Sequence, residues 1–345
     1  MKLYTIIIQP EAPFGTPLKG DTIFGHFCWQ ANESEVLNEG LDRWIACYGQ
    51  TPFAMFSSVF PVISKEGRNC FAMPRPLLPT LFPKNTQEKD RFQRLVNRKK
   101  DKKKRYLLVG EDLRVLFTEE HYCSEEALFE FHLASLPADK QKKLKLLAGA
   151  HRKFSGVFEQ AHNTLNRLTN TTGTGEFAPF SAENIHYLPN ARLAVFVLFD
   201  EQATDIDRIK NAFVNMGSWG FGRDASAGLG RFNVVDIQAM QVPESGGGAR
   251  YTLAPCVPEK GSFTASFFTP FTRFGKHGAA LIHQNKPFKN PVVMADEGAV
   301  FVPGGQQHSK SPYIGSAVTG LSKADDRTVM QGYAITLPCE IEGPL

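Results

Sequence analysis

Several features that define common protein classes are missing from this sequence of 345 residues. No apolar stretch is long enough to span a membrane, and the opening run from Leu3 to Ile8 is broken by Gln9 and Pro10. We therefore expect neither a signal peptide nor a membrane partner. The six cysteines show no CxxC spacing, which argues against a zinc site and against a secreted disulfide framework. A reducing cytoplasm is the expected location.

Motifs of covalent and metal-assisted catalysis are missing as well. The chain has no GxSxG segment and no Cys–His arrangement that would indicate a nucleophile with its base. The C-terminal histidines His277, His283 and His308 have no carboxylates at ligand spacing. We expect no metal and no other cofactor.

Charge is nearly balanced overall but concentrated in one place. The net charge is only +4, which by itself does not indicate a nucleic-acid partner. The segment from Lys84 to Arg105 holds eleven basic residues against three acidic ones, and such a local field attracts a polyanion. The same run is equally compatible with a solvated surface insertion that binds nothing.

The residues that are present predict a globular protein that mixes strands and helices. The apolar share of 42% and the 28 phenylalanines can fill a sizeable core. The run from Leu3 to Ile8 is typical of a buried strand. A helix capped by Asp21 or Thr22 is expected next, because apolar residues then recur at helical spacing. These residues are Ile23, Phe24, Phe27, Cys28 and Ala31.

The same succession returns in the second half of the chain. Arg192 to Asp200 is typical of a second buried strand, residues 204–207 resemble a capping box that opens a helix, and Arg231 begins a further strand. The expected apolar face of this helix is formed by Ile206, Ile209, Phe213 and Met216. With one more strand hidden between the halves, the order is βαββαβ. The fold class is therefore α+β, with the ferredoxin-like (RRM-like) arrangement of two helices on one face of an antiparallel sheet.

The length allows one large domain with insertions or two unequal domains. We predict a first domain over 1–240 with a long insertion around 50–190, which includes a helix near Lys140 to Asn170. A linker from Pro243 to Ala249 leads to a smaller domain over 250–345. Strand-like segments predict that this domain is β-rich, and a second ferredoxin-like unit is one form that it can take.

The strongest local signal lies between the second helix and the last strand, in residues 217–231, which we call the glycine loop. Glycines let backbone N–H groups come close to a phosphate, and arginine offers phosphate oxygens a planar and permanently charged fork. The loop contains Gly217, Gly220, Gly222, Gly228 and Gly230 together with Arg223 and Arg231. This composition predicts phosphate binding.

Other phosphate-binding loops do not fit this segment. A dinucleotide fingerprint needs a strand before its glycines and a helix after them, and the order here is reversed. A Walker loop needs Gly-Lys followed by Ser or Thr, and a kinase loop needs strands on both sides. A plain helix-to-strand turn remains the alternative, although five glycines weaken such a turn without an evident structural gain.

Three segments together resemble a known family. GSWGFGRDASAGLGRF over 217–232 resembles the glycine-rich loop of the repeat-associated RAMP proteins of CRISPR systems. PFGTPLKGDTIFGHFCW over 13–29 resembles the first loop and helix of the fourth subunit of type III-A (Csm) effector complexes. HNTLNRLTNTTGTGEF over 162–177 resembles the internal Asn/Arg/Thr motif of that subunit. The three segments cover about a seventh of the chain and follow one another in the expected order.

The resemblance implies a non-catalytic, guide-RNA-binding subunit of an antiviral complex. Such a subunit holds the repeat-derived 5′ handle of the guide RNA (crRNA), contacts the large polymerase-like signalling subunit and abuts the first backbone subunit. The basic run from Lys84 to Arg105 departs from the family pattern, and Trp219 is bulky for such a loop, where it either stacks on a base or packs.

Site residues follow from the resemblance position by position. The loop glycines with Arg223, Ser226 and Arg231 are expected to cradle handle phosphates, and the first loop and helix are expected to turn Lys19 and His26 toward the same RNA. The internal motif is expected near the RNA path or the neighbouring subunit, and its residues are Asn166, Arg167 and Thr169.

Catalytic members of the same superfamily provide a second hypothesis. Guide-processing endoribonucleases use a histidine to activate a ribose 2′-hydroxyl, and His26 and His186 are the candidates here. No second acid or base stands out beside them. Backbone subunits cut target RNA with an aspartate, but Asp21 is explained more simply as a helix cap. We predict a scaffold that is not an enzyme, and a metal-independent RNA-processing nuclease is the alternative.

Overall fold

A computed structural model describes residues 1–79, 99, 101–149, 151–241, 243, 248–278, 286–305 and 311–341. Most of the predicted basic run, residues 84–98 and 100, lies outside the described residues, as do residues 242 and 244–247 around the predicted linker. Within the described part, no helix is long and apolar enough to cross a membrane.

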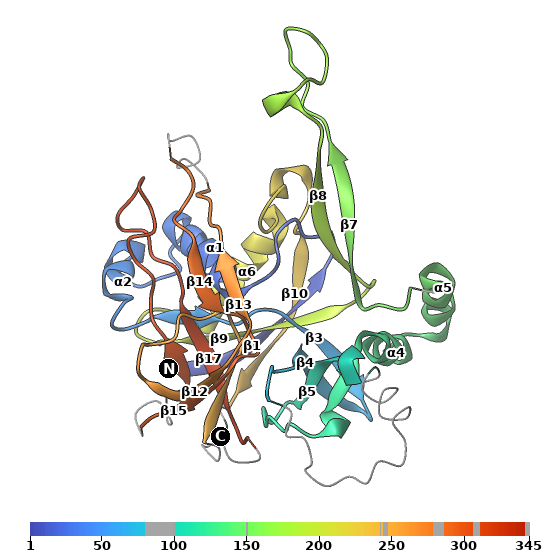
Figure 1. Ribbon diagram of the computed structural model, residues 1–345, viewed down its shortest axis with the longest axis vertical. Helices are drawn as coiled ribbons and strands as arrows, with labels where there is room; N and C mark the ends of the chain where they lie inside the picture. Colours follow the sequence, from blue (N-terminus) through green and yellow to red (C-terminus); the bar gives the residue numbers. More distant parts are fainter. Residues whose placement is uncertain are drawn as a thin grey trace.

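An antiparallel sheet of eight strands forms the centre of the molecule (Figure 1). One end of it has the strand order β10-β1-β9-β3, so the last strand of the expected unit lies beside the first, and the first lies beside the third. Helices α1 (Gly20–Glu33) and α6 (Ile206–Trp219) pack against each other and cover this part of the sheet. The predicted ferredoxin-like order is confirmed, and β3 is the strand that was hidden. The strands are β1 (Lys2–Pro10), β3 (Phe60–Lys65), β9 (Arg192–Phe199) and β10 (Phe232–Met240).

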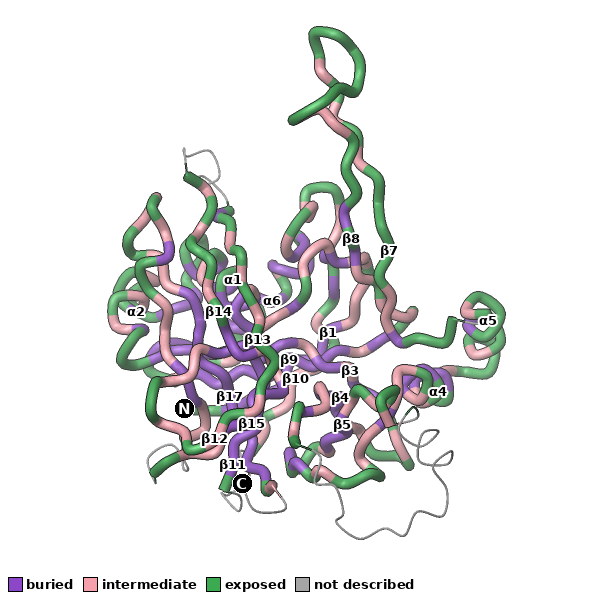
Figure 2. Tube along the Cα trace, in the orientation of Figure 1, coloured by how far each residue is buried: buried purple, intermediate pink, exposed green. Residues whose placement is uncertain are grey.

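Strand β9 shows why this part of the sequence is so uniformly apolar. Every side chain from Leu193 to Phe199 is buried. A strand with one wet face would alternate between apolar and polar residues, whereas a strand covered on both faces does not need to. Residues of the C-terminal part, among them Leu253 and Ile335, belong to the same buried cluster as β9 and the two helices. Figure 2 shows this continuous buried centre.

The remaining strands of the first sheet extend it beyond β3. Strand β2 (Ala54–Phe56) pairs with β9, and β4 (Arg68–Pro74), β5 (Lys104–Gly110) and β6 (Tyr122–Ser124) continue the sheet in that order. Helix α2 (Leu41–Cys47) follows α1 in the chain. After β6 come α4 (Glu125–Ser135) and α5 (Ala138–Ala148), the latter at the edge of the molecule (Figure 1).

A two-stranded hairpin projects from the body of the protein (Figure 1). Its strands are β7 (Ser155–His162) and β8 (Phe180–Tyr187). The predicted helix near Lys140 to Asn170 is correct only for the part that belongs to α5 and is wrong beyond it. The helix ends at Gly149, which has φ +52°, and residues 155–162 form a β-ladder with β8 instead.

The C-terminal part is β-rich, as predicted. A five-stranded sheet has the order β12-β15-β11-β17-β16, and β13 (Pro270–Arg273) pairs with β14 (Val292–Ala295) in a separate hairpin. Among the described residues from 248 onward there is no helix, so the helix pair of a second ferredoxin-like unit is not seen there. The strands of the sheet are β11 (Ala249–Thr252), β12 (Phe263–Phe267), β15 (Val300–Pro303), β16 (Tyr313–Gly315) and β17 (Tyr333–Cys339).

Candidate nucleic-acid interface

The glycine loop leaves the end of α6 and returns to the sheet through β10. At four of its five glycines an added Cβ would overlap a neighbouring atom; at Gly217, for example, that atom is the backbone carbonyl oxygen of Phe232. The expectation that a plain turn would not use these glycines is therefore wrong, because the close packing of the loop requires them. Gly228 differs: a Cβ there would meet nothing within 4 Å, and only its φ of +94° favours glycine.

Three contacts hold the inner side of the loop. The Gly222 N–H donates to Nε2 of His26 at 3.2 Å, and the Arg223 N–H donates to Oγ1 of Thr16 at 2.9 Å. The Gly230 N–H donates to the carbonyl oxygen of Pro13 at 2.7 Å. The loop is thus fastened to helix α1 and to the segment that precedes it, so two of the three resembling segments meet in space.

The side chain of Arg223 joins the loop to the base of the hairpin. Its guanidinium donates to the carbonyl oxygen of Glu183 at 2.6 Å and to Oδ1 of Asn184 at 2.8 Å. Phe14 is buried beneath this junction, with its ring near those of Tyr187 and Phe221. Part of the hydrogen-bonding capacity of Arg223 is therefore used within the protein, and its side chain is still 41% exposed.

The outer side of the loop is open to solvent. It contains the short 3-10 helix η3 (Ala225–Ala227), and Ser226 within it is exposed. Arg231 is exposed and forms no ion pair with any described residue. A hydroxyl and a guanidinium without an ion-pair partner among the described residues are therefore exposed within six positions of one loop, and each can approach a phosphate.

His26 supports the loop as a neutral ring. Burial lowers the pKa of His26 to about 4, and the Nε2 atom must be unprotonated to accept the hydrogen bond from Gly222. The ring also lies against Phe221, with centroids 4.4 Å apart. A general base needs a free lone pair and a pKa near the working pH, and His26 has neither in this arrangement.

Lys19 lies at the start of α1 and is not brought to the glycine loop. Its ammonium is 2.6 Å from Oδ1 of Asp296 and 2.7 Å from both carboxylate oxygens of Glu297, in the turn between β14 and β15. Burial raises the pKa of Glu297 to about 7; Lys19 opposes this shift and Asp296 adds to it. One ammonium thus serves two carboxylates, which leaves Lys19 little capacity for a phosphate.

Asp21 does not cap the helix as expected from the sequence. The helix begins at Gly20 with Lys19 in the cap position, so the prediction of a cap at Asp21 or Thr22 is wrong. The buried carboxylate instead accepts two hydrogen bonds from Arg273 on β13, at 2.5 and 2.8 Å. This bidentate pair holds the first helix to the C-terminal strands.

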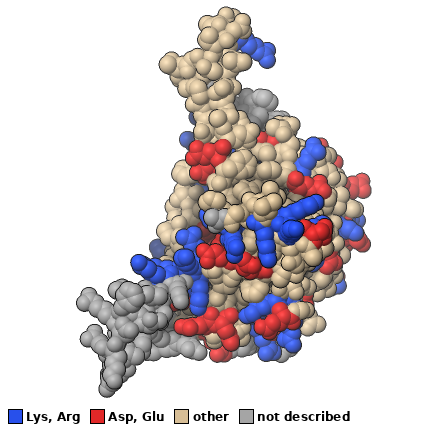
Figure 3. All heavy atoms as spheres, turned by 90° about the vertical axis from the view of Figure 1, so that its right-hand side faces the viewer, with Lys and Arg blue, Asp and Glu red and all other residues tan. Residues whose placement is uncertain are grey.

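The internal motif lies at the far tip of the hairpin (Figure 1). The Asn166 side chain accepts a hydrogen bond from the Leu168 N–H at 2.9 Å and shapes a tight turn, while Arg167 and Thr169 are exposed. The hairpin carries few charges along its length, and Figure 3 shows this face of it as almost uncharged. The structure places these three residues away from the glycine loop. His186, the other histidine candidate, is exposed on β8.

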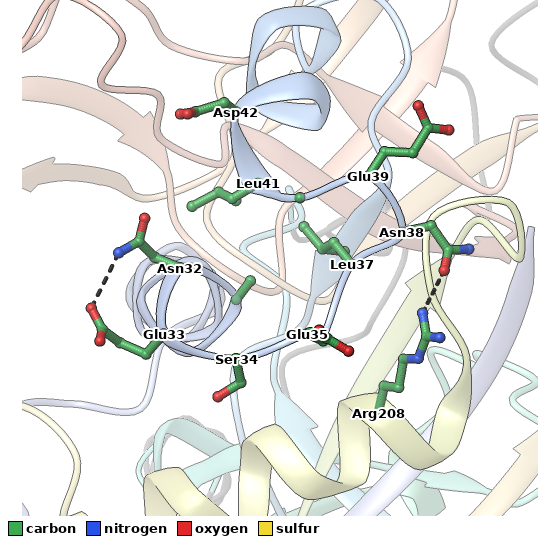
Figure 4. Close-up of a pocket in the computed structure, with 12 residues that line it drawn as sticks. Asn32, Glu33, Ser34, Glu35, Leu37, Asn38, Glu39, Leu41, Asp42 and Arg208 are labelled. Carbon is green, nitrogen blue, oxygen red and sulfur yellow. Dashed lines mark hydrogen bonds between the residues drawn. The ribbon is translucent and has the colours of Figure 1, made fainter.

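A surface pocket of about 590 Å³ lies elsewhere, between the end of α1, α2 and the start of α6 (Figure 4). Its rim carries the carboxylates of Glu33, Glu35, Glu39 and Asp42. Arg208, the basic residue in it, donates to Oδ1 of Asn38 at 2.5 Å. This excess of negative charge would repel a phosphate backbone, so the pocket is unsuited to RNA.

Several residues of the site escaped the sequence analysis. Thr16 lies inside the resembling segment 13–29 but was not singled out as a site residue. Asn184 and Arg273 lie outside the three segments, and nothing in their local sequence marks them, since their partners are distant along the chain. Among the described residues there is no group of three or more His, Cys, Asp or Glu side chains that could hold a metal ion.

The fold corresponds from end to end to chains of solved Csm complexes. One is in the crystal structure of the Csm1–Csm4 cassette in complex with pppApA, with 16% identity, 99% of this chain and 100% of that chain covered, and a TM-score of 0.52. Another is in the crystal structure of the Csm3–Csm4 subcomplex of the type III-A CRISPR-Cas interference complex, with 14% identity, coverage of 98% and 99%, and a TM-score of 0.53. Csm4 is the component that both complexes share. No family model and no curated protein matches the sequence. The resemblance drawn from the three segments is confirmed at the level of the fold.

Proposed function

We propose that this chain is the Csm4-like, guide-RNA-binding subunit of a type III-A CRISPR effector complex. The observation that carries the proposal is the end-to-end correspondence of its fold with chains from two complexes whose common component is Csm4. Three short sequence segments pointed to the same family independently of the tertiary structure. In this role the chain holds the 5′ handle of the crRNA and serves antiviral defence.

The glycine loop supplies the RNA-binding surface in this proposal. Its inner side is fastened by His26, Thr16 and Arg223, so the outer turn keeps its shape before RNA arrives. The outer side offers Ser226 and Arg231 to phosphate oxygens, and charge-assisted hydrogen bonds of this kind are among the stronger ones. Lys19 contributes indirectly, by holding α1 to the C-terminal strands.

We propose further that the chain does not cut RNA. Burial lowers the pKa of His26 to about 4, and its Nε2 lone pair accepts a hydrogen bond from the Gly222 N–H of the loop. Asp21 is paired with Arg273 inside the protein. Two of the three candidates for acid–base chemistry thus have internal partners. The third, His186, is exposed on β8, and no hydrogen bond joins it to an acid or base among the described residues.

The partner proteins in this proposal are a large signalling subunit and a backbone subunit. Csm1 and Csm3 are the proteins named with Csm4 in the corresponding structures. The projecting hairpin, with Arg167 and Thr169 exposed at its tip, extends far enough from the body to meet a neighbour or its RNA.

The decisive experiment is to express the chain with its genomic neighbours, purify it through a tag, and identify the protein and RNA that accompany it. Recovery of crRNA with an intact 5′ handle together with other Csm subunits is the expected result. A chain that purifies alone and cleaves repeat RNA in a tube would overturn the proposal in favour of the processing nuclease.

The His26→Ala variant separates the two functions further. For a scaffold, it should weaken RNA binding, because the Gly222 N–H loses its acceptor and the loop loosens. For a nuclease that uses His26 as its base, it should abolish cleavage in addition. Gel-shift and cleavage assays on the same preparation give both readouts.

A further inference from the structure

Two of the three tryptophans are exposed and touch each other beside the glycine loop. Trp29 on α1 is 39% exposed and Trp219 at the end of α6 is 52% exposed. Their ring centroids are 5.5 Å apart with an interplanar angle of 76°. The third, Trp44, is buried and donates its indole N–H to the carbonyl oxygen of Asn38. An exposed pair of indoles is large apolar surface that the fold itself leaves uncovered.

The pair sits on rigid supports that also hold the loop. Trp219 directly precedes Gly220, and one turn before Trp29 the same helix presents His26, which binds Gly222 and lies against Phe221. Contacts between α1 and the loop therefore come in two neighbouring layers. The inner layer, His26 with Phe221, is enclosed, and the outer layer, Trp29 with Trp219, faces solvent.

Gly25 leaves open space next to this pair. It lies within α1, where glycine costs about 1 kcal/mol relative to alanine. Its φ is ordinary, and an added Cβ would meet no atom of the described residues within 4 Å, so no close packing among them explains this glycine. Residues four apart share one face of a helix, which places Gly25 on the same face as Trp29.

The charges around the pair favour an anionic ligand. Near the pair, residues 22–32 of α1 and residues 212–223 of α6 and the loop contain no Asp or Glu. Asp224 follows directly and pairs with Arg223 at 3.2 Å, while the Arg223 side chain stays 41% exposed. Arg231 is the second exposed cation of the loop. An apolar surface without carboxylates, next to a loop with exposed cations, fits a single-stranded nucleic acid, whose bases stack on aromatic rings while its phosphates meet the cations.

We infer that Trp219 and Trp29 form a platform on which one nucleobase of the bound RNA stacks, next to the nucleotide whose phosphate faces the glycine loop. The inference rests on the proposed function and adds the residues that bind a base rather than the backbone. The open space at Gly25 admits the edge of that base. Stacking on such a platform tolerates any base, since every base has a π face.

The test uses the full chain and the repeat RNA encoded beside its gene, intact and with an abasic nucleotide at each position in turn. Trp219→Leu should weaken binding of intact RNA about 5- to 150-fold, the range for loss of one stacked base. One abasic position should weaken binding to the wild type and have little further effect on the variant. Binding should also quench indole fluorescence in the wild type, and less so in Trp219→Leu.

A second variant keeps the test independent of folding. Gly25→Gln fills the open space while improving helix propensity, so it should weaken RNA binding several-fold without lowering the melting temperature. Leu146→Ala is the matched control, because Leu146 is 84% exposed on α5 at the edge of the molecule, and it should bind RNA like the wild type.

The outcomes separate the platform from the proposed function. Wild-type affinity that depends on salt but is unchanged in Trp219→Leu and Trp29→Leu would overturn the platform and leave the RNA-binding role standing. Tryptophan variants that still bind RNA but no longer co-purify with another subunit would overturn the platform and show that this surface binds a protein. A wild-type chain that binds no RNA would overturn both the platform and the proposed RNA-binding role.

Discussion

The two ends of the first loop and helix meet opposite kinds of surroundings. At the start of α1, Lys19 and Asp21 are bound by charges from the C-terminal strands, and both carboxylate oxygens of Asp21 are taken by Arg273. One to two turns further on, His26 is neutral and supports the glycine loop, and Trp29 is left exposed beside it. The first region is saturated with internal partners, while the second keeps groups available for a ligand.

This difference shows that residue type alone does not tell whether a charged side chain binds a ligand or an internal partner. Lys19 and Arg231 are both cations in segments that resemble an RNA-binding family. The ammonium of Lys19 is neutralised by two carboxylates, whereas Arg231 has no ion-pair partner among the described residues. Stability should therefore depend on the first region and RNA affinity on the second.

Breaking the Asp21–Arg273 pair should have the largest effect. Asp21→Asn leaves a largely buried guanidinium without its counter-charge, and we expect a loss of about 3–5 kcal/mol in the free energy of unfolding, measured by urea denaturation. The control is Asp42→Asn, which removes an exposed ion pair with Arg327 and should cost at most about 1 kcal/mol. Equal losses in the two variants would contradict the contrast between the regions.

The two regions should also respond to pH in opposite directions. The pKa of Glu297 is raised from 4.5 to about 7, so the folded state holds the proton more tightly and stability falls as the pH rises between these values. The pKa of His26 is lowered from 6.5 to about 4, so stability falls as the pH drops between these values. Each contribution is on the order of 3 kcal/mol.

Matched variants isolate these two contributions in urea denaturation at a series of pH values. Relative to the wild type, Glu297→Gln should gain stability as the pH is raised from 4.5 to 7, and His26→Gln should gain it as the pH is lowered from 6.5 to 4. Differences from the wild type that stay constant across the range would show that neither group titrates as described.

Removal of the Lys19 charge should cost less and leave RNA binding alone. Lys19→Met deprives two carboxylates of their cation, and we expect a loss of about 2 kcal/mol, near the low end for such pairs because Glu297 can take up a proton. Lys2→Met, which breaks the exposed pair with Glu201, should lose at most about 1 kcal/mol. If Lys19→Met bound RNA more weakly at unchanged stability, the ammonium would belong to the RNA site after all.

The smallest effect is expected for Arg231, which tests the region whose groups remain available for RNA. Arg231→Ala should leave stability unchanged and lower RNA affinity several-fold, with the log–log salt slope reduced by about 0.7, as for one lost phosphate contact on a single strand. Arg114→Ala, an exposed arginine in the loop after β5, should leave the slope as it is. An unchanged slope in Arg231→Ala would remove this residue from the interface.

The elements of the fold were largely predictable, and the contacts of the site were not. Apolar periodicity located β1, α1, β9, α6 and β10, because one face of each helix and both faces of the central strands are buried. The hairpin was missed because most side chains of residues 155–162 are exposed. Such a strand shows no alternation of apolar and polar residues by which the sequence could reveal it. The glycines were taken as a sign of a ligand, although most of them serve the packing of the loop.

The sequence by itself determined the α+β class, the ferredoxin-like order of the first unit and the segments that resemble a CRISPR subunit, because these depend on local periodicity and short motifs. Only the tertiary structure decided which polar residues remain available. Lys19 and Asp21 are paired with residues more than 250 positions away, and no local pattern encodes such partners. The exposure of Arg231 and of the Trp29–Trp219 pair follows from the same long-range packing, which covers some side chains of a motif and leaves others open to a ligand.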